Sequence, residues 1–137
     1  PTDEQRTAFH AVAQAREAAL ELMSRGLAEG RVIRGRDVDE AARACIEGFG
    51  YGRGLRHRTG HSIGHRVHGY GVNLDSIEFP DSRPLAEGAC FSVEPGIYLE
   101  SFGMRSEVDC RIQAGALVVT GRERQRALLA LPDRKVR

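Results

Sequence analysis

The amino-acid sequence predicts an α+β fold in which two helices come first and antiparallel strands follow. Two amphipathic segments with helical spacing open the chain, and short segments rich in β-branched and aromatic residues occupy its last third. Helices and strands that are separated along the chain in this way are typical of helices packed on an antiparallel sheet. A chain of 137 residues has room for one domain or for part of a larger one.

The first helix is predicted over residues 3–25. Thr2 and Gln5 have the spacing of a capping box, with Thr2 as the N-cap and Gln5 at the third helical position. Gly26 and Gly30 bracket the predicted end. Apolar residues recur behind the cap at helical spacing: Phe9, Val12, Ala13, Leu20, Met23 and Leu27.

The second helix repeats the same pattern at shorter length. Asp37 is predicted as its N-cap with Glu40 three residues later, and Gly48 is predicted to end it. Its apolar stripe consists of Ala41, Ala44, Cys45 and Phe49. Glycines then alternate along 48–54. We interpret this run as a loop or connection, because it lacks the GxGxxG spacing and the preceding strand of a phosphate-binding loop.

Three strands are predicted after the glycines, over 89–99, 105–112 and 117–120. In the first of them Phe91 and Val93 point to one face while Ser92 and Glu94 point to the other. The basic segment that follows is predicted to pair as a strand or to close as a short helix over 126–131.

Composition and charge exclude several classes of protein. Hydrophobic residues make up 41% and charged residues 28% of the chain, which is ordinary for a globular domain. No segment approaches the ~20 apolar residues of a membrane span, and no secretory signal opens the chain. A net charge of +1 gives no general attraction for nucleic acid. We therefore expect neither a membrane nor a nucleic acid among its partners.

The three cysteines, Cys45, Cys90 and Cys110, form no CxxC pair and stand in apolar surroundings. We expect all three to be reduced, buried, small hydrophobic residues of a cytoplasmic protein. The alternative is a catalytic cysteine paired with a histidine, and no local pattern supports it.

Four of the five histidines lie within twelve residues: His57, His61, His65 and His68. The glycines between them disfavour a helix. In an extended segment the first three would share a face and His68 would point away. Neutral imidazole is the commonest metal ligand and carries protons near pH 7, so the cluster indicates a metal or catalytic site. Packed or exposed histidines without a function are the alternative. The HExxH zinc helix is excluded because Ser62 follows His61.

Two glutamates support the metal interpretation. Glu94 ends an apolar strand, and a buried carboxylate there needs a cation. Glu107 lies on the next predicted strand in phase with Arg105 and Asp109. If the strands lie side by side, Glu94 and Glu107 converge beside a histidine, a ligand set that suits Mn, Co, Fe or Zn. The alternative is a solvated polar face that carries Arg105 and Glu107.

Three motifs in order resemble those of the "pita-bread" metallopeptidase family, and within it the Xaa-Pro aminopeptidases and prolidases. They are HRTGHSIGHRVH over 57–68, FSVEPGIY over 91–98 and GMRSE over 103–107. The resemblance implies a site with two divalent metal ions, Mn, Co, Zn or Fe. It implies that His61 and Glu94 are metal ligands, that Glu107 bridges the two ions, and that Glu94 also moves a proton during catalysis.

The same resemblance implies roles for four further residues. His57 and His68 correspond to histidines that bind the substrate and stabilise the tetrahedral intermediate, and Tyr98 and Arg105 correspond to residues beside the metals. The implied substrate is a peptide or dipeptide with proline at its second position. The implied full-length protein is a homodimer.

The resemblance also implies two aspartate ligands from strands upstream of the first helix, and no aspartate of this chain stands in such a pattern. We therefore expect residues 1–137 to be the C-terminal portion of a catalytic domain and to be inactive alone.

Three alternatives to a proline-directed peptidase stay open. Methionine aminopeptidases share the fold, but they usually carry a glutamine where this chain has Arg105. Creatinase-like amidinohydrolases share it without metal, and Glu94 and Glu107 argue against that activity. The third is a non-catalytic binding module of the same fold, against which the intact His61, Glu94 and Glu107 also argue.

Overall fold

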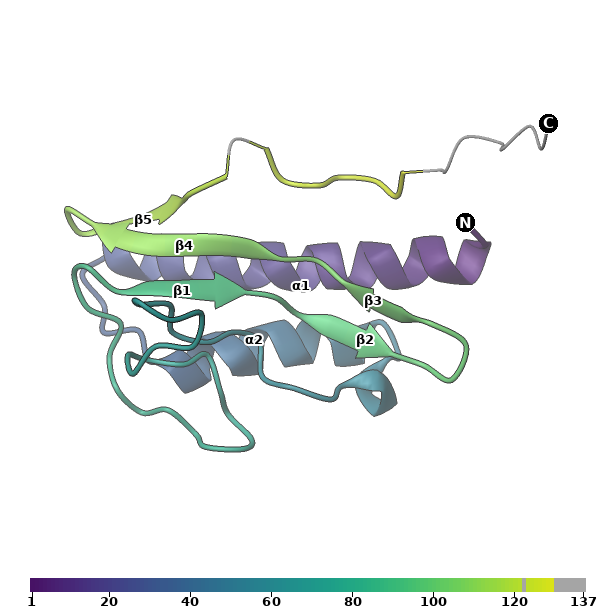
Figure 1. The fold of residues 1–137 in the computed structure, drawn as a ribbon, viewed down its shortest axis with the longest axis horizontal. Helices are drawn as coiled ribbons and strands as arrows, with labels where there is room; N and C mark the ends of the chain where they lie inside the picture. The colour runs from purple at the N-terminus through teal and green to yellow at the C-terminus, as the bar shows by residue number, and fades with distance from the viewer. Residues whose placement is uncertain (122, 130–137) are drawn as a thin grey trace.

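The computed structural model describes residues 1–121 and 123–129, in which two helices pack on short antiparallel strands (Figure 1). The helices are α1 (Asp3–Ala28) and α2 (Gly35–Gly48), and they lie side by side. The predicted order, helices first and strands afterwards, is confirmed. The strands are β1 (Cys90–Val93), β2 (Gly96–Tyr98), β3 (Gly103–Arg105), β4 (Val108–Gln113) and β5 (Ala116–Val119).

Helix α1 begins where the sequence predicts and extends beyond the predicted end. The backbone N–H of Gln5 donates to Thr2 Oγ1 (3.2 Å) and that of Thr2 donates to Gln5 Oε1 (2.8 Å), which is the expected capping box. The helix ends at Ala28, between Gly26 and Gly30 as predicted, but three residues beyond the predicted bound, because Gly26 lies inside the helix with Ile33 packed where a side chain would stand. The chain turns instead at Gly30, whose φ of +68° suits glycine.

Helix α2 begins two residues before Asp37, so the predicted cap is wrong. Arg34 is the N-cap, and Asp37 stands at the third helical position, where its carboxylate accepts the Arg34 N–H at 3.0 Å. Glu40 therefore has no part in the capping box. The helix ends at Gly48 as predicted, and the glycine run continues as a connection with one 3₁₀ turn, η1 (Gly52–Gly54).

Both of the longer predicted strands are broken, 89–99 at residues 94–95 and 105–112 at residues 106–107. Pro95 has no N–H to donate to a ladder, so 89–99 divides into β1 and β2, and its partner divides into β3 and β4. The sheet order is β1-β4-β5, and β2 pairs with β3 as a separate antiparallel pair. Of the segment 126–131, residues 126–129 form neither a helix nor a strand, and the rest lies outside the described residues.

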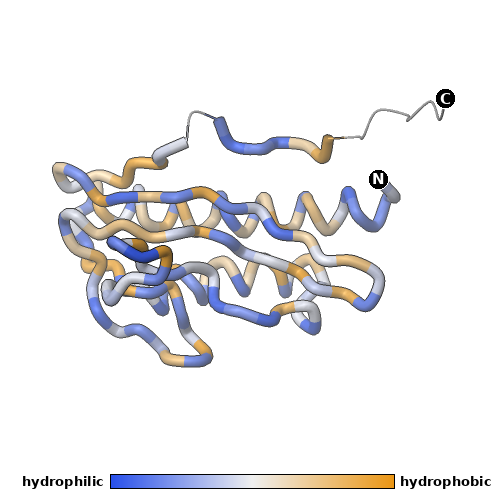
Figure 2. The backbone as a smooth tube through the Cα atoms, viewed as in Figure 1, coloured by the Kyte–Doolittle hydropathy of each residue, from blue (hydrophilic) through white to orange (hydrophobic). Residues whose placement is uncertain are grey.

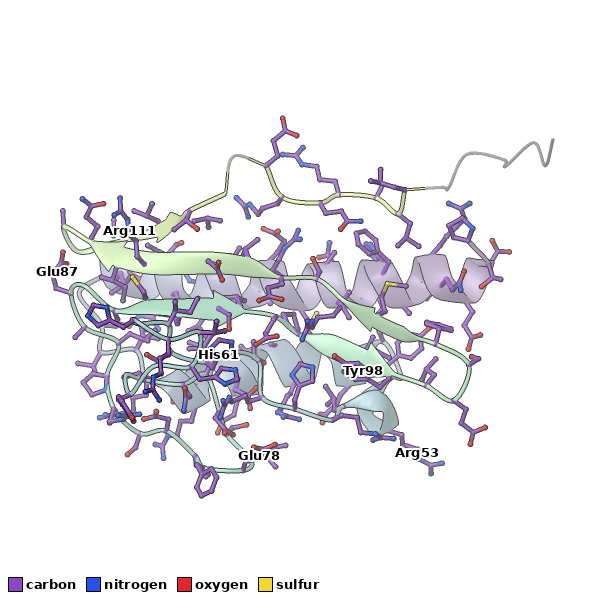
Figure 3. All side chains as sticks on the ribbon, viewed as in Figure 1. Arg53, His61, Glu78, Glu87, Tyr98 and Arg111 are labelled. Atoms are coloured by element: carbon purple, nitrogen blue, oxygen red, sulfur yellow. The ribbon has the colours of Figure 1, made fainter. Side chains whose placement is uncertain are left out.

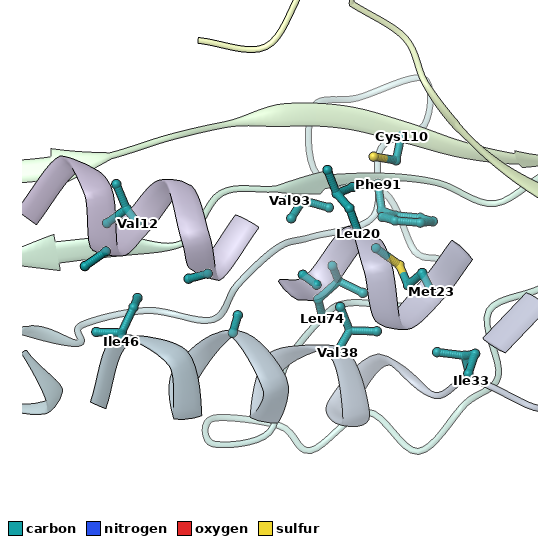
Figure 4. Packing of buried hydrophobic residues seen from close by; sticks show 14 of the residues in the cluster. Val12, Leu20, Met23, Ile33, Val38, Ile46, Leu74, Phe91, Val93 and Cys110 are labelled. Atoms are coloured by element: carbon teal, nitrogen blue, oxygen red, sulfur yellow. The ribbon is translucent and has the colours of Figure 1, made fainter. Parts of the chain in front are cut away.

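One apolar core joins the two helices to the strands. Hydrophobic and hydrophilic residues alternate along both helices (Figure 2), and the hydrophobic sides face each other and β1 (Figure 4). Leu74, in the loop that follows the histidines, is fully buried in the same core, which anchors that loop to α2. No helix of the described residues is both long and apolar enough to cross a membrane. The largest buried apolar side chains are Val12, Met23, Val38, Ile46, Leu74, Phe91, Val93 and Ile97.

The prediction for the cysteines is confirmed in part. All three are free thiols. Cys110 is buried, and burial raises the pKa of its thiol to about 12, while burial also raises the pKa of the half-buried Cys45. Cys90 is exposed, so its predicted burial is wrong. Its register partner on β4 is the exposed Arg111, and the two side chains share the outer face of the sheet.

Truncation of the core should cost far more than the same truncation at the surface. We expect Ile46→Ala to lower the free energy of unfolding by about 2–5 kcal/mol, because Ile46 is 1% exposed and its removal leaves a cavity between the helices. Ile77→Ala, at a 60% exposed position, should change it by less than about 0.5 kcal/mol. Urea denaturation of the two variants measures the difference, and equal losses would contradict this core.

Candidate active site

The break between the two strand ladders brings two carboxylates face to face. Val93 pairs with Val108 on one side of the break, and Gly96 pairs with Arg105 on the other. The two ladders share one register, so the residues in the gap lie opposite each other, Glu94 beside Glu107. Like charges directly opposite on neighbouring strands repel each other, so this arrangement requires a cation.

Arg105 supplies that positive charge in this structure. Its Nη1 donates to Glu94 Oε2 at 2.9 Å, and its Nη2 lies 3.6 Å from Glu107 Oε2. Glu94 is 8% exposed and also accepts the Ser92 hydroxyl at 3.1 Å, whereas the Glu107 side chain is 42% exposed. The charge of the buried carboxylate is therefore paired and hydrogen-bonded, as burial requires.

His61 faces Glu94 because the histidine loop, residues 57–68, lies against β1. The His61 N–H donates to Ser92 Oγ (3.0 Å), and the Ser92 N–H donates to the His61 carbonyl (2.9 Å). Gly60 makes this approach possible, because a Cβ there would overlap the Ser92 carbonyl. The imidazole Nε2 of His61, which is labelled in Figure 3, then lies 3.4 Å from Glu94 Oε1.

The hydrogen bonds of His61 leave Nε2 ready to bind a cation. Its Nδ1 lies 3.1 Å from the carbonyl of Ser62, which can only accept, so Nδ1 carries the proton. In neutral imidazole the lone pair is then on Nε2, directed at Glu94. A backbone carbonyl that holds the other ring nitrogen is the usual support of a metal-bound histidine.

His57 and Tyr98 form a hydrogen-bonded pair beside this centre. Nδ1 of His57 donates to the Arg58 carbonyl at 2.7 Å, and Nε2 accepts the Tyr98 hydroxyl at 2.9 Å when the ring is neutral. Their rings meet edge to face with centroids 5.3 Å apart. The ring of His68 contacts that of His61 in the same manner at 4.3 Å. The prediction for an extended segment is therefore wrong, because His68, predicted to point away, lines the cleft with His61, whereas His65 is exposed and does not line it.

Six of the seven predicted site residues line one open cleft of about 430 Å³. Tyr98 is the exception, and it reaches the cleft through His57. Three residues that line the cleft were not predicted as site residues: Arg58, Val67 and Glu78. Arg58 lies within the first motif, but its neighbours in sequence gave no sign that it faces the cleft. The six residues are His57, His61, His68, Glu94, Arg105 and Glu107.

The donor chemistry of the cleft fits a divalent ion, although its donors are not drawn together. Imidazole and carboxylate are the ligands of Mn, Co, Fe and Zn. Within residues 1–121 and 123–129, no three histidine, cysteine or acidic side chains are gathered closely enough to hold an ion. Arg105 lies between the two carboxylates, where it neutralises both.

A larger groove of about 510 Å³ lies away from this chemistry, between the start of α1 and residues 124–128. Its charged groups pair with one another: Glu17 accepts from Arg16 at 2.8 Å and also from Arg124. We therefore place the candidate site in the smaller cleft, where paired carboxylates and imidazoles meet.

Asp39, on α2 and outside the cleft, is a further residue that the sequence analysis did not predict. Burial alone would raise the pKa of Asp39, but hydrogen bonds from Ser76, Thr59 and Arg43 outweigh it and hold the pKa below its ordinary value of 3.8. A signal was present in the sequence, because Asp39 stands on the same helical face as the buried Ala42 and Ile46.

Comparison with known proteins identifies the family. Residues 1–114 match the model of metallopeptidase family M24. The chain belongs to this family. It is 40% identical over 113 residues to a Xaa-Pro dipeptidase from Lactobacillus helveticus, an alignment that covers 82% of this chain and 28% of the relative.

Solved structures of the family share the fold. A prolidase from Thermococcus sibiricus matches with a TM-score of 0.77 at 30% identity, over 91% of this chain and 32% of that one. An X-Pro aminopeptidase from Thermotoga maritima matches with a TM-score of 0.73 at 35% identity, over 87% and 31%. These likenesses confirm the predicted pita-bread fold. The chain spans about a third or less of the length of these relatives.

A side chain at position 60 should push the histidine loop away from β1. We expect Gly60→Ala to lower the free energy of unfolding by about 1–3 kcal/mol, because its Cβ meets backbone that has no room to move. Gly64→Ala is the control, since a Cβ there meets only Gly69 Cα at 3.7 Å. Thermal or urea unfolding compares them, and a stable Gly60→Ala protein would contradict the close approach.

Acid should lower the free energy of unfolding by protonating the carboxylates that hold the loops beside the cleft. Hydrogen bonds from Arg83 hold the pKa of Asp81 below 3.8, and the pKa of Asp39 is lowered as well. The unfolded chain therefore binds more protons in acid. The stabilisation is complete above the unfolded pKa of about 3.9 and is lost as the pH falls through the folded pKa. Urea unfolding at a series of pH values should show a shallower loss for Asp81→Asn than for wild type, and identical slopes would refute this.

Proposed function

We propose that the complete protein is a metal-dependent peptidase that hydrolyses the bond between an N-terminal residue and proline. The observation that carries the proposal is the opposition of Glu94 and Glu107 at the ladder break, with His61 Nε2 3.4 Å from Glu94. The proline-directed specificity is supported by the similarity to the Xaa-Pro dipeptidase and to the X-Pro aminopeptidase. Residues 1–137 would then form the C-terminal portion of the catalytic domain.

In this proposal His61, Glu94 and Glu107 hold divalent metal, with Mn, Co, Zn or Fe as the candidates. Two ions would need further ligands from outside this chain, because no three acidic or histidine side chains of the described residues are close enough to hold even one. A bound divalent ion would lower the pKa of a water molecule and polarise the scissile carbonyl. Arg105 would offset the repulsion between Glu94 and Glu107 through its contacts at 2.9 and 3.6 Å.

The remaining residues of the cleft handle the substrate and its proton. Glu94 would accept a proton from the attacking water and pass it to the nitrogen of proline as the C–N bond breaks. The free ring nitrogen of His68 would donate to the oxygen of the scissile carbonyl as negative charge develops there. Tyr98 holds the imidazole of His57 at 2.9 Å, so this ring would present a fixed edge to the substrate.

One observation favours a second candidate, a non-catalytic binding module. The Arg105 guanidinium lies 2.9 Å from Glu94 and 3.6 Å from Glu107, so the chain itself supplies positive charge that balances both carboxylates. The two candidates differ in metal content, so a metal-to-protein ratio separates them. The predicted homodimer and the cytoplasmic location stay predictions.

Removal of one carboxylate tests the proposed function. We expect the complete protein to bind about two divalent ions per chain, to cleave Xaa-Pro dipeptides or peptides, and to lose activity when a chelator removes the metal. Glu107→Ala should lower kcat/KM by more than about 100-fold while the fold persists, because its role is to place charge. Glu100→Ala, at an exposed position outside the cleft, is the control.

Metal analysis, circular dichroism and hydrolysis of a Xaa-Pro dipeptide measure these effects. Full activity after exhaustive metal removal, or near-normal turnover by Glu107→Ala, would contradict the proposed metallopeptidase activity. A stable, metal-free and inactive wild type would identify the binding module instead.

A further inference from the structure

The buried carboxylate of Asp39 is hydrogen-bonded to two segments that line the cleft, the histidine loop and the loop of Glu78. Asp39 is 0% exposed on α2 and lines no part of the cleft. Its Oδ1 accepts the N–H of Thr59 at 2.7 Å, midway between His57 and His61. Its Oδ2 accepts both the N–H (2.8 Å) and the hydroxyl (2.5 Å) of Ser76, at the start of the loop that carries Glu78.

Arg43 completes the link one helical turn later. Its Nε donates to Asp39 Oδ2 at 2.8 Å, and its Nη2 donates to the carbonyl of His57 at 2.9 Å. The planar guanidinium therefore holds the carboxylate and the histidine loop in one rigid arrangement. Every oxygen of the buried carboxylate is occupied, so the charge is fully satisfied.

We propose that Asp39 is a positioning residue for the peptidase reaction, acting through Thr59, Ser76 and Arg43 to set the spacing between the histidine loop and the loop of Glu78. This inference rests on the proposed function. Asp39 touches none of the predicted metal ligands, so its effect reaches the reaction only through the placement of the cleft walls.

Stability alone explains this arrangement poorly. A buried ion pair adds little net stability, because desolvation of both charges offsets their attraction, and apolar residues of similar size often do as well. An apolar side chain at position 39 would nevertheless leave the Thr59 and Ser76 amides and the Arg43 guanidinium without an acceptor. What the carboxylate does uniquely is hold donors from three segments at one point on a rigid helix, as placement of a site requires.

Two substitutions test the proposal in the complete protein. Asp39→Asn keeps the size of the side chain but offers one oxygen to four donors, so one wall of the cleft should come loose. Arg43→Lys keeps a positive charge beside Asp39 but removes the fork that also reaches His57. Asp37→Ala is the matched control, because it removes a carboxylate of the same helix that contacts only the N-terminus of α2.

We expect Asp39→Asn to lower kcat/KM for a Xaa-Pro dipeptide by about 100-fold, mainly through kcat, because small displacements of reacting groups cost rate more than binding. Arg43→Lys should lower it by about 10-fold. Asp37→Ala should lower the melting temperature and leave kcat/KM within about threefold of wild type, at a temperature where every variant is folded. Wild-type kcat/KM in both Asp39→Asn and Arg43→Lys, or an equal loss in Asp37→Ala, would overturn the proposal.

Imidazole NMR spectra keep the inference testable if the wild type cleaves no Xaa-Pro peptide, an outcome that would refute the proposed function only. The ring resonances of His57 and His61 should shift in Asp39→Asn and Arg43→Lys, while those of His10, on α1, stay in place. In Asp37→Ala all of them should stay in place. Unmoved His57 and His61 resonances in Asp39→Asn would refute the positioning role.

Discussion

Two glutamates that face each other across a gap in an antiparallel ladder are the constraint on which the site depends. Pro95 opens the gap because it has no N–H for the ladder, and the shared register on its two sides brings Glu94 opposite Glu107. Two carboxylates on opposite residues of neighbouring strands, one of them buried, require positive charge between them. Arg105 provides it in this structure, and the same electrostatic demand is what would attract a divalent ion.

The rest of the fold holds the histidines against this pair of charges. Gly60 lets the histidine loop touch the backbone of β1, and it also exchanges backbone hydrogen bonds with Leu74, which is buried in the core. Asp39 fastens the loop to α2 from behind. The histidines of the site therefore lie on a loop whose position is set by backbone and side-chain contacts with β1 and α2.

The similarity to longer relatives shows how the cleft can belong to a larger catalytic centre. The chain carries one histidine and two glutamates that suit divalent metal, and it spans about 28% of the Lactobacillus helveticus enzyme. The two carboxylates contact Arg105 and Ser92, and no three donors of the described residues are gathered closely enough to hold an ion, which fits the proposal that other chain segments complete the site. Arg105 also accounts for the stability of the two carboxylates when no metal is bound, which makes metal content the property that separates an enzyme from a binding module.

Local pattern by itself determined the two helices, the start of α1, the order of helices before strands and the three motifs that carry the six predicted residues of the cleft. These features follow from hydrophobic periodicity, capping and residue type, which act over a few neighbouring positions. Only the tertiary structure decided that Asp37 caps from inside α2, that Cys90 is exposed, that the ladder breaks at Pro95, and that Asp39 is bonded to the histidine loop. Asp39 bonds Thr59 and Ser76, 20 and 37 positions away in sequence. Such contacts depend on how the helix packs against loops that have no periodicity, so no local pattern encodes them.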